Sequence, residues 1–247
     1  MNIDLNKIEL LLRDSKLIQR IFYYEFIDST NDVAKDLMGH GLLVIAEKQK
    51  RGKGRRGRLW ISPYGGLWFS LVMKLNRNRY PIPLYNLMVG VAVARVIKKL
   101  GLDVCLKWPN DVIINNKKVC GILSEVIKDR IVIGIGINVN VDIQEFPIDL
   151  RSSVTSLMNE LGNEVDREEL LVNIIKEIEN MYLKFDKNEI LKSWKALDMT
   201  LNKYVRVLLN NKVIEGLAID IDNDGALLII TSNNELMKFY SCDVSIR

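Results

Sequence analysis

Histidine is almost missing from the sequence. The single one, His40, stands between Gly39 and Gly41 in a predicted turn. Catalytic sets that need an imidazole base, such as Ser/His/Asp and Cys/His, are therefore disfavoured. No pair of carboxylates stands at a recognisable acid–base spacing either. What remains is chemistry that needs positioned cations around a phosphate and little proton transfer, such as nucleotidyl transfer.

Cysteines and long apolar runs are also scarce. The cysteines, Cys105, Cys120 and Cys242, are far apart and form no CxxC motif, which predicts reduced core thiols and argues against a zinc site. The longest apolar run, "LMVGVAVARVI" from Leu87, contains Arg95 and is well short of the roughly 20 residues that span a bilayer. The N-terminal segment lacks the basic start and apolar core of a signal peptide. We expect a cytoplasmic protein with no membrane role.

The remaining composition is that of a folded chain. Of 247 residues, 48% are apolar and only five are proline, which predicts a well-buried core. Apolar, β-branched runs predict strands from about residues 21, 42 and 67 and three more between 104 and 141, and apolar residues at three-to-four spacing predict helices at about 84–100 and, in two pieces, 166–197. This order predicts an α+β fold, a mixed β-sheet with helices on one face.

The pattern of apolar and turn residues in the sequence changes near Thr200. From there on, short apolar runs alternate with turn residues such as Asp224-Gly225, which is typical of a small β-barrel or hairpin stack. We therefore predict two domains, residues 1–199 and 200–247.

A glycine-rich basic loop is the strongest local signal. Residues 48–58 hold seven basic residues, so the chain without them would carry 4 − 7 = −3 charges, and the excess positive charge is local. The loop could be a solvated charge run, a nucleic-acid contact, or a phosphate cradle in which glycines admit an anion to backbone amides and arginines add forked hydrogen bonds. Gln49, before the glycines of the loop, and Trp60, after them, favour the cradle. Like charges also predict that the loop stays unfolded until an anion binds.

Two shorter motifs are weak alone. "KWPND" places Asn110 and Asp111 at the end of a strand, where an ordinary turn is equally well explained. "GIGIN" from Gly134 lacks the third glycine of a dinucleotide fingerprint and lies within a strand, so its glycines are expected to let another group pack against the sheet.

Taken together, the motifs resemble the ordered set of the biotin protein ligases. They are "DSTN" from Asp28, "AEKQKRGKGRRGRLWISPYGGLWFS" from Ala46, "KWPNDV" from Lys107, "KKVCGILSE" from Lys117 and "GIGINV" from Gly134. The β-rich tail resembles the family's SH3-like C-terminal domain, and the sheet its catalytic domain. Only about twenty residues precede the first strand, so the resemblance is to the ligase-only class without a DNA-binding domain.

The resemblance implies a two-step reaction. Biotin and ATP, with Mg²⁺, give biotinyl-5′-adenylate and pyrophosphate, and a lysine of a biotin carboxyl carrier domain then takes the biotinyl group. It also implies a homodimer. A lipoate ligase remains an alternative, and a non-enzymatic nucleic-acid-binding protein that uses the loop at 48–58 is the alternative from another class.

The resemblance also implies roles for individual residues. Arg55, Lys118 and Asp111 match the catalytic set, and Asp111 would either hold metal or receive the acceptor lysine. The ATP-binding set is Arg55, Arg56, Arg58, Trp60, Asn110, Lys118 and Asn138. The biotin-binding set is Ser29, Thr30, Gln49, Gly52, Lys53, Arg55, Lys118 and Gly121. Lys53 stands where the family often has arginine, so it keeps the charge but loses the bidentate fork.

Overall fold

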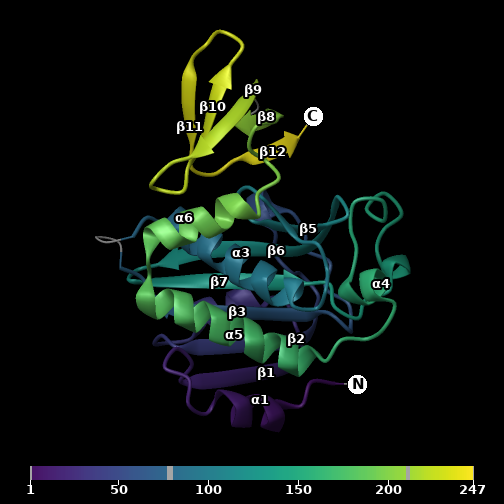
Figure 1. Cartoon of the computed structure of the whole chain (residues 1–247). Helices are drawn as coiled ribbons and strands as arrows, with labels where there is room; N and C mark the ends of the chain where they lie inside the picture. Colours follow the sequence, from purple (N-terminus) through teal and green to yellow (C-terminus); the bar gives the residue numbers. More distant parts are fainter. Residues whose placement is uncertain (1, 77–79, 210–211, 247) are drawn as a thin grey trace.

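The chain folds around two β-sheets. The computed structural model describes residues 2–76, 80–209 and 212–246 (Figure 1). Seven strands form the large sheet in the order β1-β2-β3-β7-β6-β5-β4. They are β1 (Arg20–Ile27), β2 (Leu42–Gln49), β3 (Leu67–Lys74), β4 (Cys105–Lys107), β5 (Asp111–Ile114), β6 (Lys117–Ile127) and β7 (Arg130–Ile137).

The large sheet is mixed. β1 and β2 pair in parallel, and the other neighbours pair antiparallel. β2 and β3 are buried over almost their whole length, because both faces of the sheet are covered at its centre. The Asn115-Asn116 turn has positive φ at both residues, as a tight hairpin requires, and joins β5 to β6.

Most helices pack on one face of this sheet. They are α1 (Leu5–Leu12), α3 (Ile82–Lys98), α5 (Arg167–Lys184) and α6 (Lys187–Ala196). Their apolar faces meet Leu43 and Ile45 of β2 in the main core. Three short elements complete the part before the second sheet: α4 (Leu157–Leu161), η1 (Arg55–Gly57) and η2 (Ile143–Glu145).

The mixed α+β class is as predicted, with one departure from helices on a single face. α2 (Thr30–Asp36) packs on the opposite face, where its Ala34 meets Leu42 and Val44. Successive strand side chains point to opposite faces, so the continuous apolar run of β2 needs cover on both sides. This placement brings the start of α2 to the glycines of β7.

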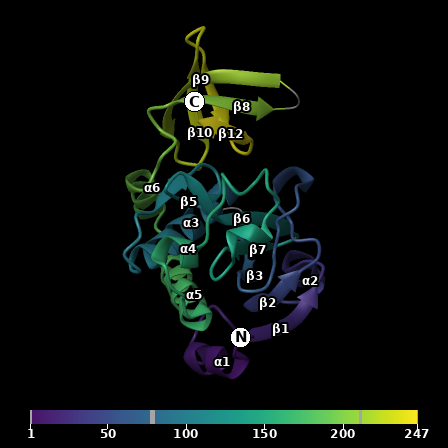
Figure 2. The same ribbon diagram turned by 90° about the vertical axis from the view of Figure 1, so that its right-hand side faces the viewer.

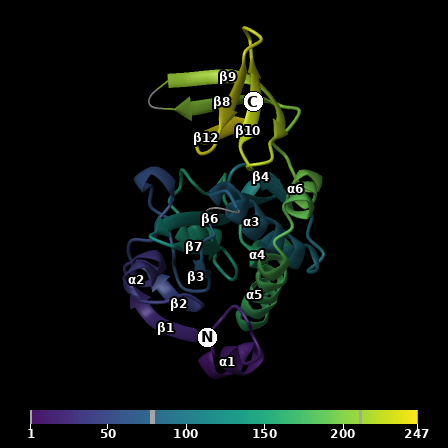
Figure 3. The same cartoon turned by 90° about the vertical axis from the view of Figure 1, so that its left-hand side faces the viewer.

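The C-terminal residues form a separate five-stranded antiparallel sheet, in the order β11-β10-β9-β8-β12. Its strands are β8 (Tyr204–Leu209), β9 (Lys212–Ile221), β10 (Leu227–Thr231), β11 (Leu236–Phe239) and β12 (Asp243–Ile246). Figures 2 and 3 show this sheet at one end of the molecule and α1 at the other. The SH3-like β-structure is as predicted, whereas a domain boundary at residue 200 stays a prediction.

The two sheets are joined through buried contacts. The Trp108 indole donates to the carbonyl of Gly225 (3.1 Å), and the Trp108 amide donates to Thr200 Oγ1 (3.0 Å). Trp108 is 1% exposed. Trp108 therefore anchors the small sheet next to the later residues of its own motif, "KWPND".

All three cysteines are free, and Cys120 and Cys242 are buried. Burial raises the pKa of the Cys242 thiol to about 12 and also raises that of Cys120. Both therefore belong to the core, as predicted, and Cys105 is half-buried. None of the helices in the described ranges is long and apolar enough to cross a membrane.

Candidate active site

A cavity of about 610 Å³ lies between the basic loop, the large sheet and the strand β12. It gathers twelve of the fourteen residues assigned above to catalysis, biotin or ATP: Ser29, Thr30, Gln49, Lys53, Arg55, Arg58, Trp60, Asn110, Asp111, Lys118, Gly121 and Asn138. Arg56 and Gly52 are not among its lining residues. Residues scattered over more than a hundred positions of the sequence thus share one cavity of ligand-binding size.

Trp60 lies against the glycines of β6 and β7. A Cβ added at Gly136 would stand 2.4 Å from Trp60 Nε1, and one at Gly121 would stand 2.8 Å from Cζ3 of the same ring. The indole also meets Trp68 edge-on at 6.4 Å. Gly136 of "GIGIN" therefore admits a packed group, as predicted from the sequence, and that group is Trp60.

Arg55 is held from three sides. Its guanidinium donates to Asn110 Oδ1 (3.3 Å), to the carbonyl of Cys242 (3.0 Å) and to Ser241 Oγ (2.7 Å). Burial lowers the pKa of Arg55, with nearby Asp243 acting in the opposite direction, but a guanidinium stays protonated in proteins. The fixed cation is therefore preorganised in the cavity.

The other loop cations are mostly paired within the chain. Four of the seven reach a carboxylate: Arg51 pairs with Asp28, Lys53 with Asp32, and Arg56 and Arg58 with Asp243. The loop is folded, with η1 at its tip. The predicted repulsion that would keep it unfolded is thus largely offset by three aspartates, which the sequence does not place near it.

Gly52 and Arg56 contribute outside the cavity wall. A Cβ at Gly52 would come within 2.4 Å of the Trp60 carbonyl and 2.6 Å of Ser62 Oγ, so glycine lets the loop fold back on itself. Arg56 donates to the carbonyl of Leu208 at 3.0 Å. Its side chain thus reaches the small sheet, and its phosphate contact stays a prediction.

Lys118 and Asp111 form an ion pair of 2.6 Å in the cavity. The Lys118 ammonium also stands 5.0 Å from the centre of the Trp60 ring, a distance at which a cation and an aromatic face attract. Both side chains are about one quarter exposed, 28% for lysine and 22% for aspartate. A ligand can therefore reach both.

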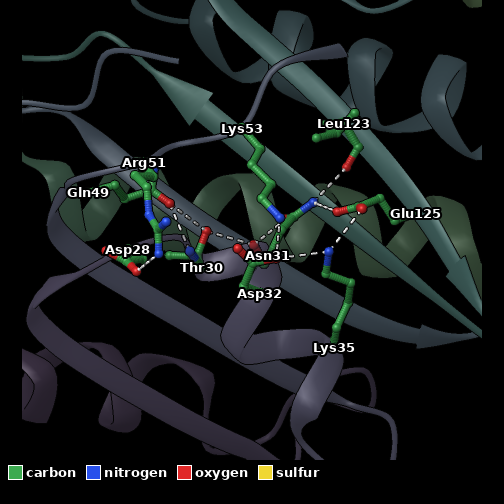
Figure 4. A network of polar contacts seen from close by, with 11 residues as sticks. Asp28, Thr30, Asn31, Asp32, Lys35, Gln49, Arg51, Lys53, Leu123 and Glu125 are labelled. Atoms are coloured by element: carbon green, nitrogen blue, oxygen red, sulfur yellow. Dashed lines mark hydrogen bonds and ion pairs between the residues drawn. The ribbon is translucent and has the colours of Figure 1, made fainter. Parts of the chain in front are cut away.

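Gln49 and Thr30 supply neutral polar groups to the cavity, beside the ion pairs of Arg51 with Asp28 and of Lys53 with Asp32 (Figure 4). Gln49 Oε1 accepts from the Thr30 amide (2.8 Å), and Gln49 Nε2 donates to Ser62 Oγ (2.8 Å). Ser29 is 1% exposed and makes no side-chain capping bond to α2, so its hydroxyl is left for the cavity. Lys53, in contrast, bonds Asp32 at 2.5 Å.

Three buried polar atoms on the cavity wall have no hydrogen-bond partner among the described residues: Trp60 Nε1, Asn138 Oδ1 and Asp111 Oδ1. Asp111 Oδ1 is in ion-pair contact with Lys118, which leaves the Trp60 donor and the Asn138 acceptor. The Asn138 amide nitrogen is fixed by the carbonyl of Thr155 at 2.9 Å. Buried polar groups are normally paired, so these two atoms indicate contacts that a ligand makes.

The described residues of the cavity suit a metal ion only if nucleotide phosphates supply most of its ligands. The described residues hold no group of three or more His, Cys, Asp or Glu side chains in metal-binding geometry. Asp111 offers one carboxylate, and Mg²⁺ is commonly bound by one or two carboxylates together with substrate phosphates. Asp111 therefore suits Mg²⁺ that enters with a nucleotide.

Several site residues were given no role from the sequence, although Asn31 and Ser70 stand within the quoted motifs. Asn31 and Ser70 lie beside the neutral groups of the cavity, and Ser241 and Asp243 hold the loop arginines. The contact between Arg55 and Ser241 joins residues 186 positions apart. Only the tertiary structure brings them together.

Comparison with known proteins agrees with this architecture. Residues 23–142 match the model of the Biotin/lipoate A/B protein ligase family, and residues 200–247 match that of the Biotin protein ligase C terminal domain. The Bifunctional ligase/repressor BirA of Bacillus subtilis is 33% identical over 95% of this chain and 76% of its own length. The Biotin--[acetyl-CoA-carboxylase] ligase of Mycobacterium tuberculosis is 28% identical over 76% of this chain and 73% of its own.

A solved structure is similar over nearly the whole chain. The biotin protein ligase from Aquifex aeolicus in complex with biotin and ATP superposes with a TM-score of 0.82 and 30% identity, covering 93% of this chain and 99% of that one. The fold and the catalytic-domain match define a protein of the biotin/lipoate ligase class. The C-terminal match and the full-length relatives narrow the class: the chain belongs to the biotin protein ligases.

Proposed function

We propose that this chain joins biotin to ATP and then to protein. In the first step a biotin carboxylate oxygen attacks the α-phosphorus of ATP, and pyrophosphate leaves. In the second step a lysine amine of a biotin carboxyl carrier domain attacks the acyl carbon of biotinyl-5′-AMP, and AMP leaves. The names of the similar proteins, among them a ligase structure with biotin and ATP, support this reaction.

The single observation that carries the proposal is that one cavity is lined by two kinds of group. Ser29, Thr30 and Gln49 offer neutral hydrogen-bonding groups, and Arg55 and Lys118 offer cations. A bicyclic urea with a short carboxylate tail needs the first, and a nucleotide phosphate needs the second. A cavity that only contacted a nucleic-acid backbone would not need the neutral groups.

Arg55 and Lys118 act on the reacting phosphate. Arg55 is fixed before the reaction, so it stabilises charge that develops on the α-phosphate without reorganising. Lys118 lies between Asp111 and the Trp60 face, and its ammonium can bridge the biotin carboxylate and the phosphate. Mg²⁺, when bound with ATP, supplies further neutralisation of the phosphate charge.

Asp111 has two proposed roles, reception of the acceptor lysine and contact with Mg²⁺, and we give more weight to the first. Its carboxylate lies 2.6 Å from the Lys118 ammonium as an ion pair, which supports a role in holding an amine. We therefore assign Asp111 chiefly to reception of the acceptor lysine, and a contact with Mg²⁺ is its second role.

Asn138 and Trp60 take the adenine in this proposal. The unpartnered Asn138 Oδ1 accepts from the base edge, and the Trp60 ring stacks on the base. Arg56 and Arg58 reach the phosphates when their bonds with the small sheet exchange. The homodimer, the absence of a DNA partner and the cytoplasmic location stay predictions.

Biotin-dependent exchange of labelled pyrophosphate into ATP tests the first step. Exchange with biotin and not with lipoate is the expected result, and transfer of label from biotin to a purified carrier domain tests the second step. Exchange with lipoate alone would assign the chain to the other branch of its family. Exchange with neither, together with salt-sensitive binding to RNA or DNA, would overturn the proposal.

A further inference from the structure

A row of hydrogen bonds links the neutral groups of the cavity to a charged group outside it. Thr30 and Ser70 hydroxyl oxygens are 2.7 Å apart, and Ser70 Oγ is 2.6 Å from Asn31 Oδ1. Asn31 Nδ2 donates to Glu125 Oε2 at 2.8 Å, and the other Glu125 oxygen accepts from Lys35 at 3.0 Å. Figure 4 shows Asn31, Lys35 and Glu125 meeting at one point.

The carboxylate fixes the direction of every bond in the row. An ionised carboxylate only accepts, so the Asn31 amide must turn its NH₂ to Glu125 and its oxygen to Ser70. The 2.6 Å contact with that oxygen requires the Ser70 proton. A hydroxyl has one proton, so at 2.7 Å the Thr30 hydroxyl must donate to Ser70.

The Thr30 oxygen is thereby left as an acceptor toward the cavity. Its oxygen lies 3.2 Å from Gln49 Oε1, whose own amide group is already oriented by the Thr30 N–H and by Ser62. Two acceptors face each other at this distance, and a ligand N–H placed between them would satisfy both. Thr30 and Ser70 are 4% and 0% exposed, so water has little access to this end of the row.

We propose that the row Glu125–Asn31–Ser70 is a positioning and specificity device that makes Thr30 an acceptor and selects ligands with an N–H group at that place. This inference rests on the proposed function, because a ureido ring presents such an N–H and a dithiolane ring does not. Gly134 belongs to the device, since a Cβ there would stand 2.2 Å from Asn31 Oδ1.

Replacement Glu125→Gln reverses the row with little change in shape. The Lys35 ammonium has only donors, so it takes the new amide oxygen, and the new NH₂ group faces Asn31. Asn31 must then turn its oxygen outward and its NH₂ to Ser70. Ser70 gives its proton to Thr30, and Thr30 donates to Gln49 or to the cavity. The side chain of Glu125 is 32% exposed, so the variant is expected to fold.

The experiment measures dissociation constants for biotin and two analogues in which one or the other ureido N–H is replaced by a ring oxygen. Isothermal titration is done on the wild type, Glu125→Gln, Ser70→Ala and the control Glu177→Gln. The control removes a carboxylate that pairs with Arg95 on the helical face at 3.0 Å. Thermal unfolding checks each variant.

The preference of the wild type for biotin over one analogue is expected to fall about tenfold or more in Glu125→Gln and Ser70→Ala, which is the weight of one hydrogen bond. The control is expected to keep the wild-type preference. Equal weakening of all three ligands would show a merely structural role and overturn the inference, as would an unchanged preference. A wild type that does not bind biotin would instead overturn the proposed function. If Ser70→Ala does not fold, Glu125→Gln decides.

Discussion

Replacement of Arg55 by alanine gives the sharpest prediction for catalysis. The guanidinium is held by Asn110, Ser241 and the carbonyl of Cys242, so it stands in place before ATP binds. Loss of one preorganised donor to a developing charge typically costs about 3 kcal/mol in the barrier, a rate decrease of roughly 10²- to 10³-fold. Its effect on folding is smaller, about 1–2 kcal/mol, because the lost hydrogen bonds are partly replaced by water.

The assay is biotin-dependent pyrophosphate exchange at saturating biotin and ATP, with the unfolding temperature as a check of the fold. Arg51→Ala is the matched control, since it removes an arginine of the same loop whose side chain is 71% exposed and pairs with Asp28. Arg55→Lys keeps the charge without the fork and is expected to recover only part of the activity. If Arg55→Ala and Arg51→Ala both keep activity within about fivefold of wild type, the reasoning on preorganisation is wrong.

Three further predictions concern stability and shape. Arg167→Ala leaves the 1%-exposed Glu47 without its ion pair of 2.8 Å and is expected to cost about 3–5 kcal/mol in chemical denaturation; a loss below about 1 kcal/mol would contradict this. Although burial alone would raise it, hydrogen bonds from Ser15, Lys16 and Leu17 hold the pKa of Glu179 below its usual 4.5. The stability that wild type has over Glu179→Gln should therefore be complete above about pH 5 and shrink as the pH falls below 4.5, through the lowered pKa; a pH-independent difference in urea titrations would refute it. Gly136→Ala places a Cβ 2.4 Å from Trp60 Nε1 and should reduce pyrophosphate exchange at least about tenfold by displacing the indole, whereas unchanged exchange would show that the ring can move.

The elements that could be predicted from sequence are those with strong local patterns. The apolar runs of β2 and β3 and the periodic helices α3 and α5 appear where the pattern indicates. α4 was not predicted, because five residues show no period. The strand order was not predictable either, because the pairing of β3 with β7 joins runs about sixty residues apart and depends on burial on both faces.

The residues of the candidate site divide in the same way, into those with a sequence motif and those placed only by the fold. Motif residues such as Gln49, Trp60 and Lys118 line the cavity as the resemblance implied, but their chemical roles stay predictions. The partners that orient them were not predicted. Asn31 entered only as part of the motif "DSTN", whereas its amide reaches Glu125 on another strand, and Asp243 lies 185 residues from its partner Arg58. Such contacts depend on the whole chain folding first.

The hydrogen bonds between Arg55 and the residues next to β12 also limit how the domains of such a protein can be exchanged. Ser241 and the Cys242 carbonyl precede β12, so a substitution that shifts this strand also moves the Arg55 cation that we propose to act on the reacting phosphate. The C-terminal sheet could not then be exchanged freely for that of a relative, because the loop and the strand have to be inherited as a matched pair. A chimera that keeps its own loop but takes a foreign tail would fold and yet lose the alignment of its first chemical step.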